Sequence, residues 1–297
     1  MIVLEDLDVT QPGPGQVLVR VAAAGVGNWD ALVRTGRSGL PLSLPLTLGA
    51  EVAGVVQTVG AGNSARLAPA QAVYGSTNSL YSGGYAEYAV CSADMLAAKP
   101  EGLTPAQAAS LPVAAVMAWQ MVVEHARVAA GQTVVVHGAA GNVGAFAVQI
   151  ACARGAKVTG TVREEKDEET VRALGATDVI RNQGDYARFA RGAEVVIDTV
   201  GGRSQAALFS LVKSGGLLVS SVSRPDRALA REAQIRVDYF IAAVTTAALG
   251  EITRLLDAGR LQVRVGVTLP LRDAHVAHEM LEGTRPRPDG KIVLDVE

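Results

Sequence analysis

The spacing of hydrophobic residues divides this sequence into two parts with different periods. In the first hundred residues, short apolar runs are separated by glycine and proline. The runs at 17–21, 51–56 and 84–90 predict β-strands, and the Pro-Gly-rich stretch at 11–15 predicts a turn before the first of them. This part of the chain is expected to consist mainly of β-structure.

After Pro105 the apolar residues recur at helical spacing as far as Val128, and Thr104 occupies the position of an N-cap. Beyond this point, β-branched runs alternate with amphipathic stretches. The predicted strands are 133–137, 156–161, 195–199 and 216–221, and the predicted helices are 142–154, 165–174 and 203–213. Regular alternation of this kind is typical of a parallel sheet covered by helices, so we expect an α/β fold with a doubly wound parallel sheet.

The last part of the chain contains one more amphipathic helix. Its apolar stripe is Leu249, Ile252, Leu255 and Leu256, and Gly259 ends it. A short helix at 273–282 and a strand at 291–294 are predicted to follow.

The strand predicted at 133–137 leads directly into a glycine-rich turn and then into a helix. Gly138 allows the chain to turn, Gly141 allows the backbone to approach a ligand, and Gly144 allows the helix to lie close to the strand. The first N–H groups of the helix have no partner within it, and with the helix dipole they attract an anion. A strand, turn and helix in this order predict binding of a dinucleotide pyrophosphate. The expected contacts are Gly138, Ala140, Gly141, Asn142, Val143 and Gly144.

Composition narrows the possible functions. Of the 297 residues, 49% are hydrophobic and 19% are charged, which is enough apolar material for a large core. The formal net charge is −2 and no basic stripe is present, so no nucleic-acid partner is expected. Because the sequence has no apolar run of membrane-spanning length and no secretory pattern at its start, a cytoplasmic protein without a membrane partner is expected. Cys91 and Cys152 are too few for a disulfide framework or a zinc cluster.

Five stretches match motifs of one protein family: Gly25–Asp30, Leu48–Gly54, Gly138–Gly144, Asp198–Gly202 and Gly290–Leu294. Together they resemble the medium-chain dehydrogenase/reductase superfamily, and within it the zinc-independent NADPH:quinone oxidoreductase branch related to zeta-crystallin. The resemblance covers nearly the whole chain. It implies a GroES-like β-barrel substrate domain at 1–100, completed by 262–297, and a Rossmann dinucleotide-binding domain at 101–261, with a cofactor cleft between them.

The same resemblance implies further properties. Relatives usually have a strand ahead of the segment that matches residues 3–15, and without it we expect the barrel to keep its fold with a weakened or rearranged edge. Cofactor contacts are also implied for Val200, Gly201 and Lys291. A homodimer is expected through the edge of the Rossmann sheet near Leu217–Ser220.

Zinc-dependent relatives bind catalytic zinc with a Cys and a His at two positions that are Gly27 and Ala50 in this chain. Neither side chain can ligate a metal, so we predict no metal site and a substrate that is reduced without a Lewis acid. A quinone or an α,β-unsaturated carbonyl meets this condition, because a few hydrogen-bond donors can stabilise the oxygen anion that hydride addition produces. His275 and His278 lie at spacing i, i+3, and we interpret them as part of an ordinary surface helix rather than as a metal site.

The end of the second Rossmann strand bears on the choice between NADPH and NADH. Proteins that bind the ribose 2′-hydroxyl usually have an Asp or Glu there, whereas this chain has Val162 followed by Arg163. Valine avoids repulsion of a 2′-phosphate, and the arginine fork suits phosphate. Arg181 is a further candidate, as is Lys166 unless it belongs to a solvated helix face. These residues predict NADPH, with the alternative that a shifted turn presents Glu164 to a ribose hydroxyl.

Few side chains near the nicotinamide are candidates for chemistry. Asn28 can donate a hydrogen bond to a substrate oxygen and is the candidate catalytic residue, whereas Asp30 is interpreted as a cap of the helix that begins there. Leu32 and Met117 replace polar residues that are frequent in the family, so no proton donor is assigned. Packing roles are expected for Tyr74, Tyr81, Tyr85 and His137.

The expected function is an oxidoreductase that transfers a hydride from NADPH to an electron-poor small molecule, either a quinone or an enone. An enoyl-thioester reductase is a close alternative, because it shares the fold and the cofactor. A non-catalytic NADPH-binding protein is an alternative of a different class, favoured by the apolar residues expected near the nicotinamide.

Overall fold

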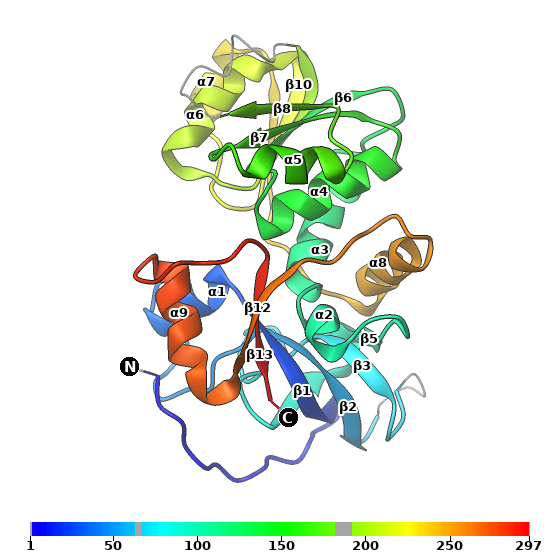
Figure 1. Cartoon of the computed structure of the whole chain (residues 1–297), viewed down its shortest axis with the longest axis vertical. Helices are drawn as coiled ribbons and strands as arrows, with labels where there is room; N and C mark the ends of the chain where they lie inside the picture. Colours follow the sequence, from blue (N-terminus) through cyan, green and yellow to red (C-terminus); the bar gives the residue numbers. More distant parts are fainter. Residues whose placement is uncertain (1, 63–66, 182–191, 297) are drawn as a thin grey trace. The chain divides into compact units, whose positions relative to one another are not determined.

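The computed structural model describes residues 2–62, 67–181 and 192–296 (Figure 1). The chain forms two compact units. Unit 1 comprises Met1–Val113, Val244–Asp257 and Val263–Glu297, and unit 2 comprises Ala114–Ala243 and Ala258–Gln262. Each unit contains its own sheet and its own hydrophobic core.

Unit 1 is built on a mainly antiparallel sheet, in which the described residues form seven strands. The strand order is β12 (Val265–Pro270), β13 (Lys291–Asp295), β1 (Gln16–Val26), β2 (Glu51–Val59), β3 (Ala72–Ser76) and β5 (Leu96–Ala98), and β4 (Tyr88–Ser92) also pairs with β1. Alternate valines of β1, at positions 17, 19 and 21, are buried with Val52 and Val56 of β2, because successive side chains of a strand face opposite sides. The β-structure predicted for this part of the chain is confirmed.

Four α-helices accompany this sheet among the described residues: α1 (Asn28–Arg34), α2 (Pro105–Ala109), α8 (Thr246–Asp257) and α9 (Ala274–Glu282). Short 3₁₀ turns at Ala93–Met95 and Leu271–Asp273 precede β5 and α9. Thr104 caps α2 as predicted, since its hydroxyl accepts the N–H of Gln107 while the Gln107 amide oxygen accepts the N–H of Thr104. Helices α1 and α9 contact each other, so segments far apart in sequence meet here.

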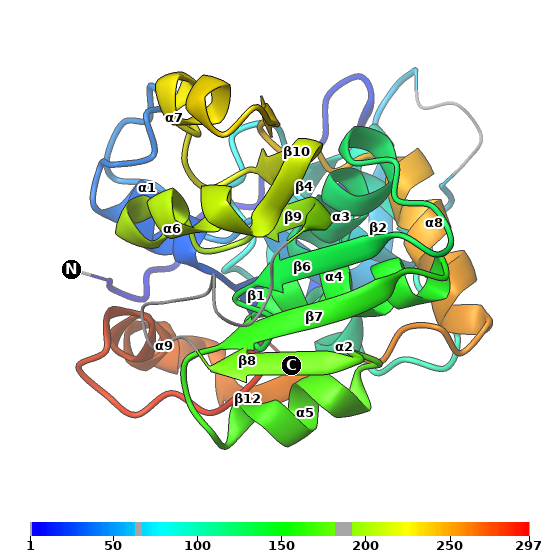
Figure 2. The ribbon, with the colours of Figure 1, turned by 90° about the horizontal axis from the view of Figure 1, so that it is seen from above.

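Unit 2 contains the predicted parallel sheet. Its strand order is β11 (Arg236–Tyr239), β10 (Val212–Ser220), β9 (Ala193–Asp198), β6 (Thr133–His137), β7 (Lys157–Val162) and β8 (Asp178–Arg181). Helices α4 (Asn142–Ala153) and α5 (Asp167–Ala173) pack on β6, β7 and β8, and α7 (Arg227–Glu232) packs on β11 (Figure 2). The doubly wound parallel arrangement predicted from the alternating pattern is confirmed.

Two of the predicted helices are wrong in extent. The helix predicted from Ala106 to Val128 is broken into α2, α3 (Pro112–Trp119) and a π-helical stretch, Gln120–His125. The break falls before Pro112, because a proline disfavours helical backbone in the residue ahead of it. The helix predicted at 203–213 is a series of single turns at Gly202–Ser204, α6 (Gln205–Leu208) and Phe209–Leu211. It ends early because Val212 already pairs with Ala193 as the first residue of β10.

Two sheet predictions also need correction. The strand predicted at 84–90 begins only at Tyr88, because residues 83–85 donate backbone hydrogen bonds to residues 47–49 in an irregular loop. Leu217–Ser220, predicted at the edge of the parallel sheet, is an interior segment paired on both sides, with β9 and with β11. The edge strand on that side is β11, whose four residues alternate between polar and apolar, and β8 is the edge strand on the other side. Residues 2–13 form no helix or strand.

Candidate functional site

The glycine-rich turn joins β6 to α4 in unit 2 and has the geometry of a phosphate cradle. Gly138 has a φ of +79°, which side chains disfavour, and a Cβ there would lie 2.9 Å from the Thr199 hydroxyl oxygen. A Cβ at Gly144 would lie less than 3.0 Å from the Gly138 carbonyl oxygen, so only glycine allows the helix to start this close to the turn. Gly141 is the N-cap of α4, and the N–H groups of residues 142–144 have no acceptor within the helix. The turn therefore fits a pyrophosphate.

Other predicted cofactor residues lie beside this turn. A Cβ at Gly138 would also contact the side chain of Val200, which follows β9. The backbone N–H groups of Val200 and Gly201 donate to one carboxylate oxygen of buried Asp198 at 3.1 and 2.9 Å, and Gln205 donates to the other at 2.8 Å. Asp198 thus holds the loop after β9 next to the glycine-rich turn.

His137 ends β6 and is buried. Its Nδ1 lies 2.8 Å from the Thr161 hydroxyl and its Nε2 lies 3.1 Å from the Ser204 hydroxyl. Burial lowers the pKa of His137, and the Asp198 carboxylate partly opposes this shift. A largely neutral imidazole with two hydroxyl partners agrees with the predicted packing role.

At the end of β7, a buried valine is followed by an exposed arginine. Val162 is 3% exposed, whereas the side chain of Arg163 is 86% exposed. Arg163 pairs with Glu164 at 3.1 Å, and Lys166 pairs with the second oxygen of the same carboxylate at 3.2 Å. Hydrogen bonds from Lys166 and then Arg163 lower the pKa of Glu164. Glu164 therefore connects the two candidate phosphate-binding cations.

Arg181 lies at the end of β8, in register with Val162 of β7. Its guanidinium pairs with Glu165 at 2.8 Å and with Glu168 at 3.0 Å. Since β7 and β8 end side by side, the three predicted cations gather at one corner of the sheet. Sequence reasoning left open whether Lys166 belongs to a solvated helix face and missed these pairings; the mixed charges at 163–169 were the available signal.

In unit 1, Gly27 and α1 form a second group of predicted residues. Asn28 is the first residue of α1 and is exposed. Asp30 is 1% exposed, and its Oδ2 accepts the N–H of Gly27 at 2.8 Å, as expected of a helix cap. Burial raises the pKa of Asp30 to about 6, against the Gly27 hydrogen bond and the positive charge of Lys291.

Lys291 lies in the interior of unit 1. Its side chain is 6% exposed and its ammonium donates to Glu51, whose side chain is 2% exposed. The other Glu51 oxygen accepts the N–H of Val113 at 2.9 Å. The structure therefore shows Lys291 in a buried ion pair, and sequence reasoning missed Glu51, an acidic residue within an apolar strand.

The residues at the expected zinc positions do not fit a metal. Gly27 and Ala50 provide no ligand atoms, and a Cβ at Gly27 would lie 3.4 Å from the Lys291 ammonium nitrogen. Among the described residues, no three His, Cys, Asp or Glu side chains are grouped so that they could hold a metal ion. His275 is exposed but His278 is buried, so the interpretation of both as surface residues is wrong for His278. Helix α9 turns His278 into the interior, where it meets the Tyr85 ring.

Two of the three candidate tyrosines, Tyr74 and Tyr81, make hydrogen bonds through their hydroxyls. Tyr74 is fully buried, and its hydroxyl donates to the Leu249 carbonyl at 3.0 Å and lies 3.0 Å from the Thr253 hydroxyl. Burial raises the pKa of Tyr74 to about 12. The Tyr81 hydroxyl accepts the N–H of Val244 at 3.3 Å. Both contacts agree with the predicted packing roles.

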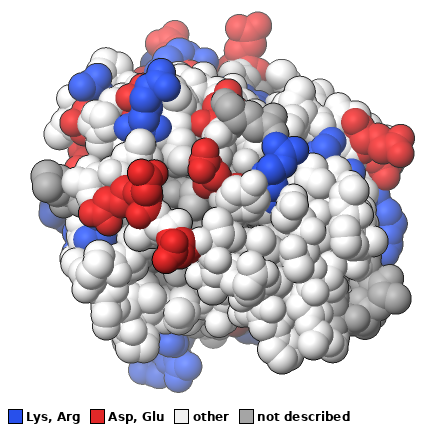
Figure 3. Space-filling model, turned by 90° about the horizontal axis from the view of Figure 1, so that it is seen from below, with Lys and Arg blue, Asp and Glu red and all other residues white. Residues whose placement is uncertain are grey.

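Helix length and the charges on one face of the molecule bear on its possible partners. In the part of the chain that the structure describes, no helix has both the length and the apolar character needed to cross a membrane. The face drawn in Figure 3 carries Lys and Arg interspersed with Asp and Glu among uncharged residues.

Comparisons with known proteins extend this description. A family model described as an alcohol dehydrogenase GroES-like domain matches residues 13–101, and one described as a zinc-binding dehydrogenase matches residues 174–294. The quinone oxidoreductase of Homo sapiens is 31% identical over 307 residues, covering 97% of this chain and 92% of that protein.

Two solved structures are also similar over nearly the full length. An alcohol dehydrogenase superfamily protein from Novosphingobium aromaticivorans has a TM-score of 0.90 and 35% identity, covering 99% of this chain and 96% of that chain. An NAD-dependent alcohol dehydrogenase has a TM-score of 0.89 and 31% identity, covering 99% and 95%.

Proposed function

The chain belongs to the medium-chain dehydrogenase/reductase superfamily, and we propose that it transfers a hydride from NADPH to a quinone or an α,β-unsaturated carbonyl. Members of this family are oxidoreductases that bind a nicotinamide cofactor. The observation that carries the proposed acceptor class is full-length similarity to a protein named quinone oxidoreductase. The cofactor and metal proposals rest on the residues described above.

NADPH is favoured by the corner of the unit 2 sheet where β7 ends. A buried valine, Val162, replaces the carboxylate that would repel a 2′-phosphate, and exposed Arg163 follows it. The ion pairs of Arg163 and Lys166 with Glu164 lie at the surface, where such pairs contribute little stability, so a phosphate can displace the carboxylate at small cost. NADH is the second candidate, because Glu164 itself can accept a ribose hydroxyl and one similar structure is described as NAD-dependent.

Reduction without zinc is proposed because Gly27 and Ala50 offer no ligand atoms. An unactivated aldehyde would then lack a Lewis acid, whereas a quinone or an enone already accepts a hydride readily. Asn28, exposed at the start of α1, is proposed to donate a hydrogen bond to the acceptor oxygen as negative charge develops there.

The chain's own contribution to the reaction is binding and orientation. The N–H groups of residues 142–144 hold the pyrophosphate, and Asp198 holds the loop with Val200 and Gly201 against the glycine-rich turn. When bound, the nicotinamide supplies the hydride. The protein's task is to hold an acceptor in line for its transfer, which alone accounts for a large part of many rate enhancements.

The experiment that tests this proposal is NADPH oxidation followed by absorbance with a panel of benzoquinones, naphthoquinones, alkenals and crotonyl thioester, with and without EDTA. We expect turnover with quinones or alkenals, higher efficiency with NADPH than with NADH, and no effect of EDTA. Loss of activity in EDTA would refute the metal-free reaction. Equal efficiency with both cofactors would refute the NADPH preference, and tight NADPH binding without turnover would identify a non-catalytic binding protein.

Two further properties are proposed on the family resemblance. The protein forms a homodimer, for which β11 offers one edge of the parallel sheet, and it is cytoplasmic. Light scattering of the purified chain tests the first of these, and cell fractionation tests the second.

A further inference from the structure

Unit 1 contains neighbouring buried polar groups that have few hydrogen-bond partners in the described part of the chain. Both ring nitrogens of His278 and the Nε of Arg34 have none, and the Asp30 carboxyl and the Tyr85 hydroxyl meet each other. Burying a polar group without a partner is unfavourable, so such groups are few in native proteins. Several in one place require a common explanation.

The inner end of this group is the Asp30 carboxyl. Glu51 on β2 and Lys291 on β13 face it, and Glu51 is already bonded to Lys291. A second carboxylate in this buried place gives the cluster a net negative charge. Burial, with repulsion from Glu51, raises the pKa of Asp30 to about 6 despite Lys291 and the Gly27 hydrogen bond. Asp30 can therefore gain and lose a proton near neutral pH.

Tyr85 and His278 are the next side chains of the cluster after Asp30. The Tyr85 hydroxyl has a side-chain hydrogen bond with the Asp30 carboxyl. Burial and then the Asp30 carboxylate raise the pKa of Tyr85, so its hydroxyl stays protonated. The Tyr85 and His278 rings meet edge to face, with their centroids 6.1 Å apart. Two proton-carrying groups from different segments thus lie in contact in the interior.

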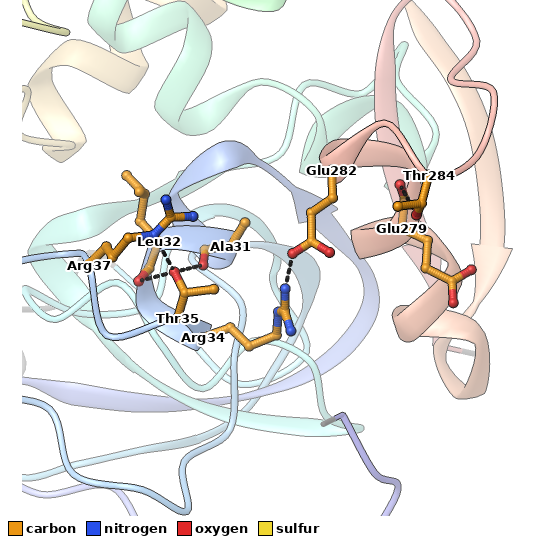
Figure 4. Close-up of polar contacts among 8 residues, drawn as sticks. All are labelled: Ala31, Leu32, Arg34, Thr35, Arg37, Glu279, Glu282 and Thr284. Atoms are coloured by element: carbon orange, nitrogen blue, oxygen red, sulfur yellow. Dashed lines mark hydrogen bonds and ion pairs between the residues drawn. The ribbon is translucent and has the colours of Figure 1, made fainter.

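The outer end lies where α1 and α9 meet. Burial and then the Arg34 guanidinium lower the pKa of His278 to about 4, so its ring is neutral at pH 7, with one donor and one acceptor nitrogen. The Arg34 guanidinium also donates to Glu282 on α9 (Figure 4). The side chains of Arg34 and Glu282 are 24% and 40% exposed, so this end reaches solvent.

We propose that Tyr85 and His278 form a proton path between the buried Asp30 carboxyl and the surface where α1 and α9 meet. A hydroxyl and a neutral imidazole can each accept a proton on one side and release one on the other. When the O–H bond of Asp30 breaks, the negative charge stays on its carboxylate, and the path later restores the proton from solvent.

The test measures the path directly, without turnover. Infrared difference spectra of the unliganded full chain between pH 5 and pH 8 contain the carboxyl C=O band of Asp30, assigned by its loss in D30N. A rapid pH jump then gives the rate at which this band relaxes. We expect Y85F and H278Q to slow the relaxation at least about tenfold, in line with the general size of proton-transfer effects.

Y85F is the decisive variant because it removes the hydroxyl that lies between Asp30 and His278 and keeps the aromatic ring that packs on His278. Y81F is the matched control, since that hydroxyl bonds to Val244 and lies outside the path. Unchanged relaxation in Y85F overturns the path whether or not the enzyme is active. A slowed relaxation in a chain that oxidises no NADPH with any acceptor supports the path and overturns only the proposed function.

Discussion

The Lys291 ammonium donates a hydrogen bond to the Glu51 carboxylate in the interior of unit 1, although the two residues are 240 positions apart in the sequence. The pair joins β13 to β2, and the second Glu51 oxygen accepts the N–H of Val113. Because both charges are removed from water, the attraction between them offsets a large desolvation penalty.

Removing one partner of this pair should destabilise the fold strongly. K291M leaves the buried Glu51 carboxylate without its counter-charge, which costs about 3 to 5 kcal/mol in comparable pairs. The loss in E51Q should be smaller, because Lys291 keeps the neighbouring Asp30 carboxylate. Urea unfolding at pH 7 measures the loss, and the double variant E51Q/K291M should recover part of it. K213M, which breaks the surface pair with Glu194, should leave the stability nearly unchanged, because exposed ion pairs contribute little. Equal losses in K291M and K213M would contradict this prediction.

The close approach of α4 to the glycine-rich turn predicts that G144A weakens cofactor binding. The added Cβ would meet the Gly138 carbonyl, and relief of that contact must displace the N-terminus of α4 that holds the pyrophosphate. Overpacking of this kind costs about 1 to 3 kcal/mol, measurable as a lower affinity in an NADPH fluorescence titration.

The matched control for G144A is G250A in α8, where an added Cβ meets nothing within 4 Å. Alanine is favoured over glycine in a helix by about 1 kcal/mol, so G250A should be slightly more stable and bind NADPH normally. A normal affinity in G144A would show that this turn does not hold the cofactor.

Replacement of Arg163 should change the affinity for NADPH and not the affinity for NADH. R163A should weaken NADPH binding about tenfold, the value of one charge-assisted hydrogen bond, and leave NADH binding unchanged, because NADH has no 2′-phosphate. Isothermal titration with both cofactors measures this difference. R172A, which removes an exposed arginine from α5, is the control. A parallel loss for both cofactors would point to a structural role of Arg163 instead.

Because His278 is buried, the free energy of unfolding should fall in acid. Its folded-state pKa is about 4, below the ordinary value of 6.5, so the unfolded chain binds more protons between these values. Stability is therefore complete above pH 6.5 and falls as the pH drops toward 4, by about 3 kcal/mol from this group. Urea unfolding at several pH values should show a shallower acid loss in H278Q. H275Q, at an exposed position on the same helix, should follow the wild-type profile.

Sequence reasoning succeeded where a structure depends on neighbouring residues. The β6–turn–α4 segment was predicted with nearly correct bounds because its glycines, β-branched run and helical spacing all lie within about twenty residues. It failed at 203–213, where helical spacing was overridden by the pairing of Val212 with Ala193. It also misplaced the edge of the sheet, because strand order depends on which distant segments pair.

The sequence determined the two-part α/β organisation, the glycine-rich turn, the absence of ligand atoms at Gly27 and Ala50, and the cations that follow β7 and β8, because each depends on residue type and short-range spacing. Only the tertiary structure decided that Lys291 is buried against Glu51 and that His278 lies inside unit 1 beside Tyr85. Periodicity places a side chain on a face of its helix or strand, but the element that covers that face comes from elsewhere in the chain. The burial and pKa values of those residues follow from that packing.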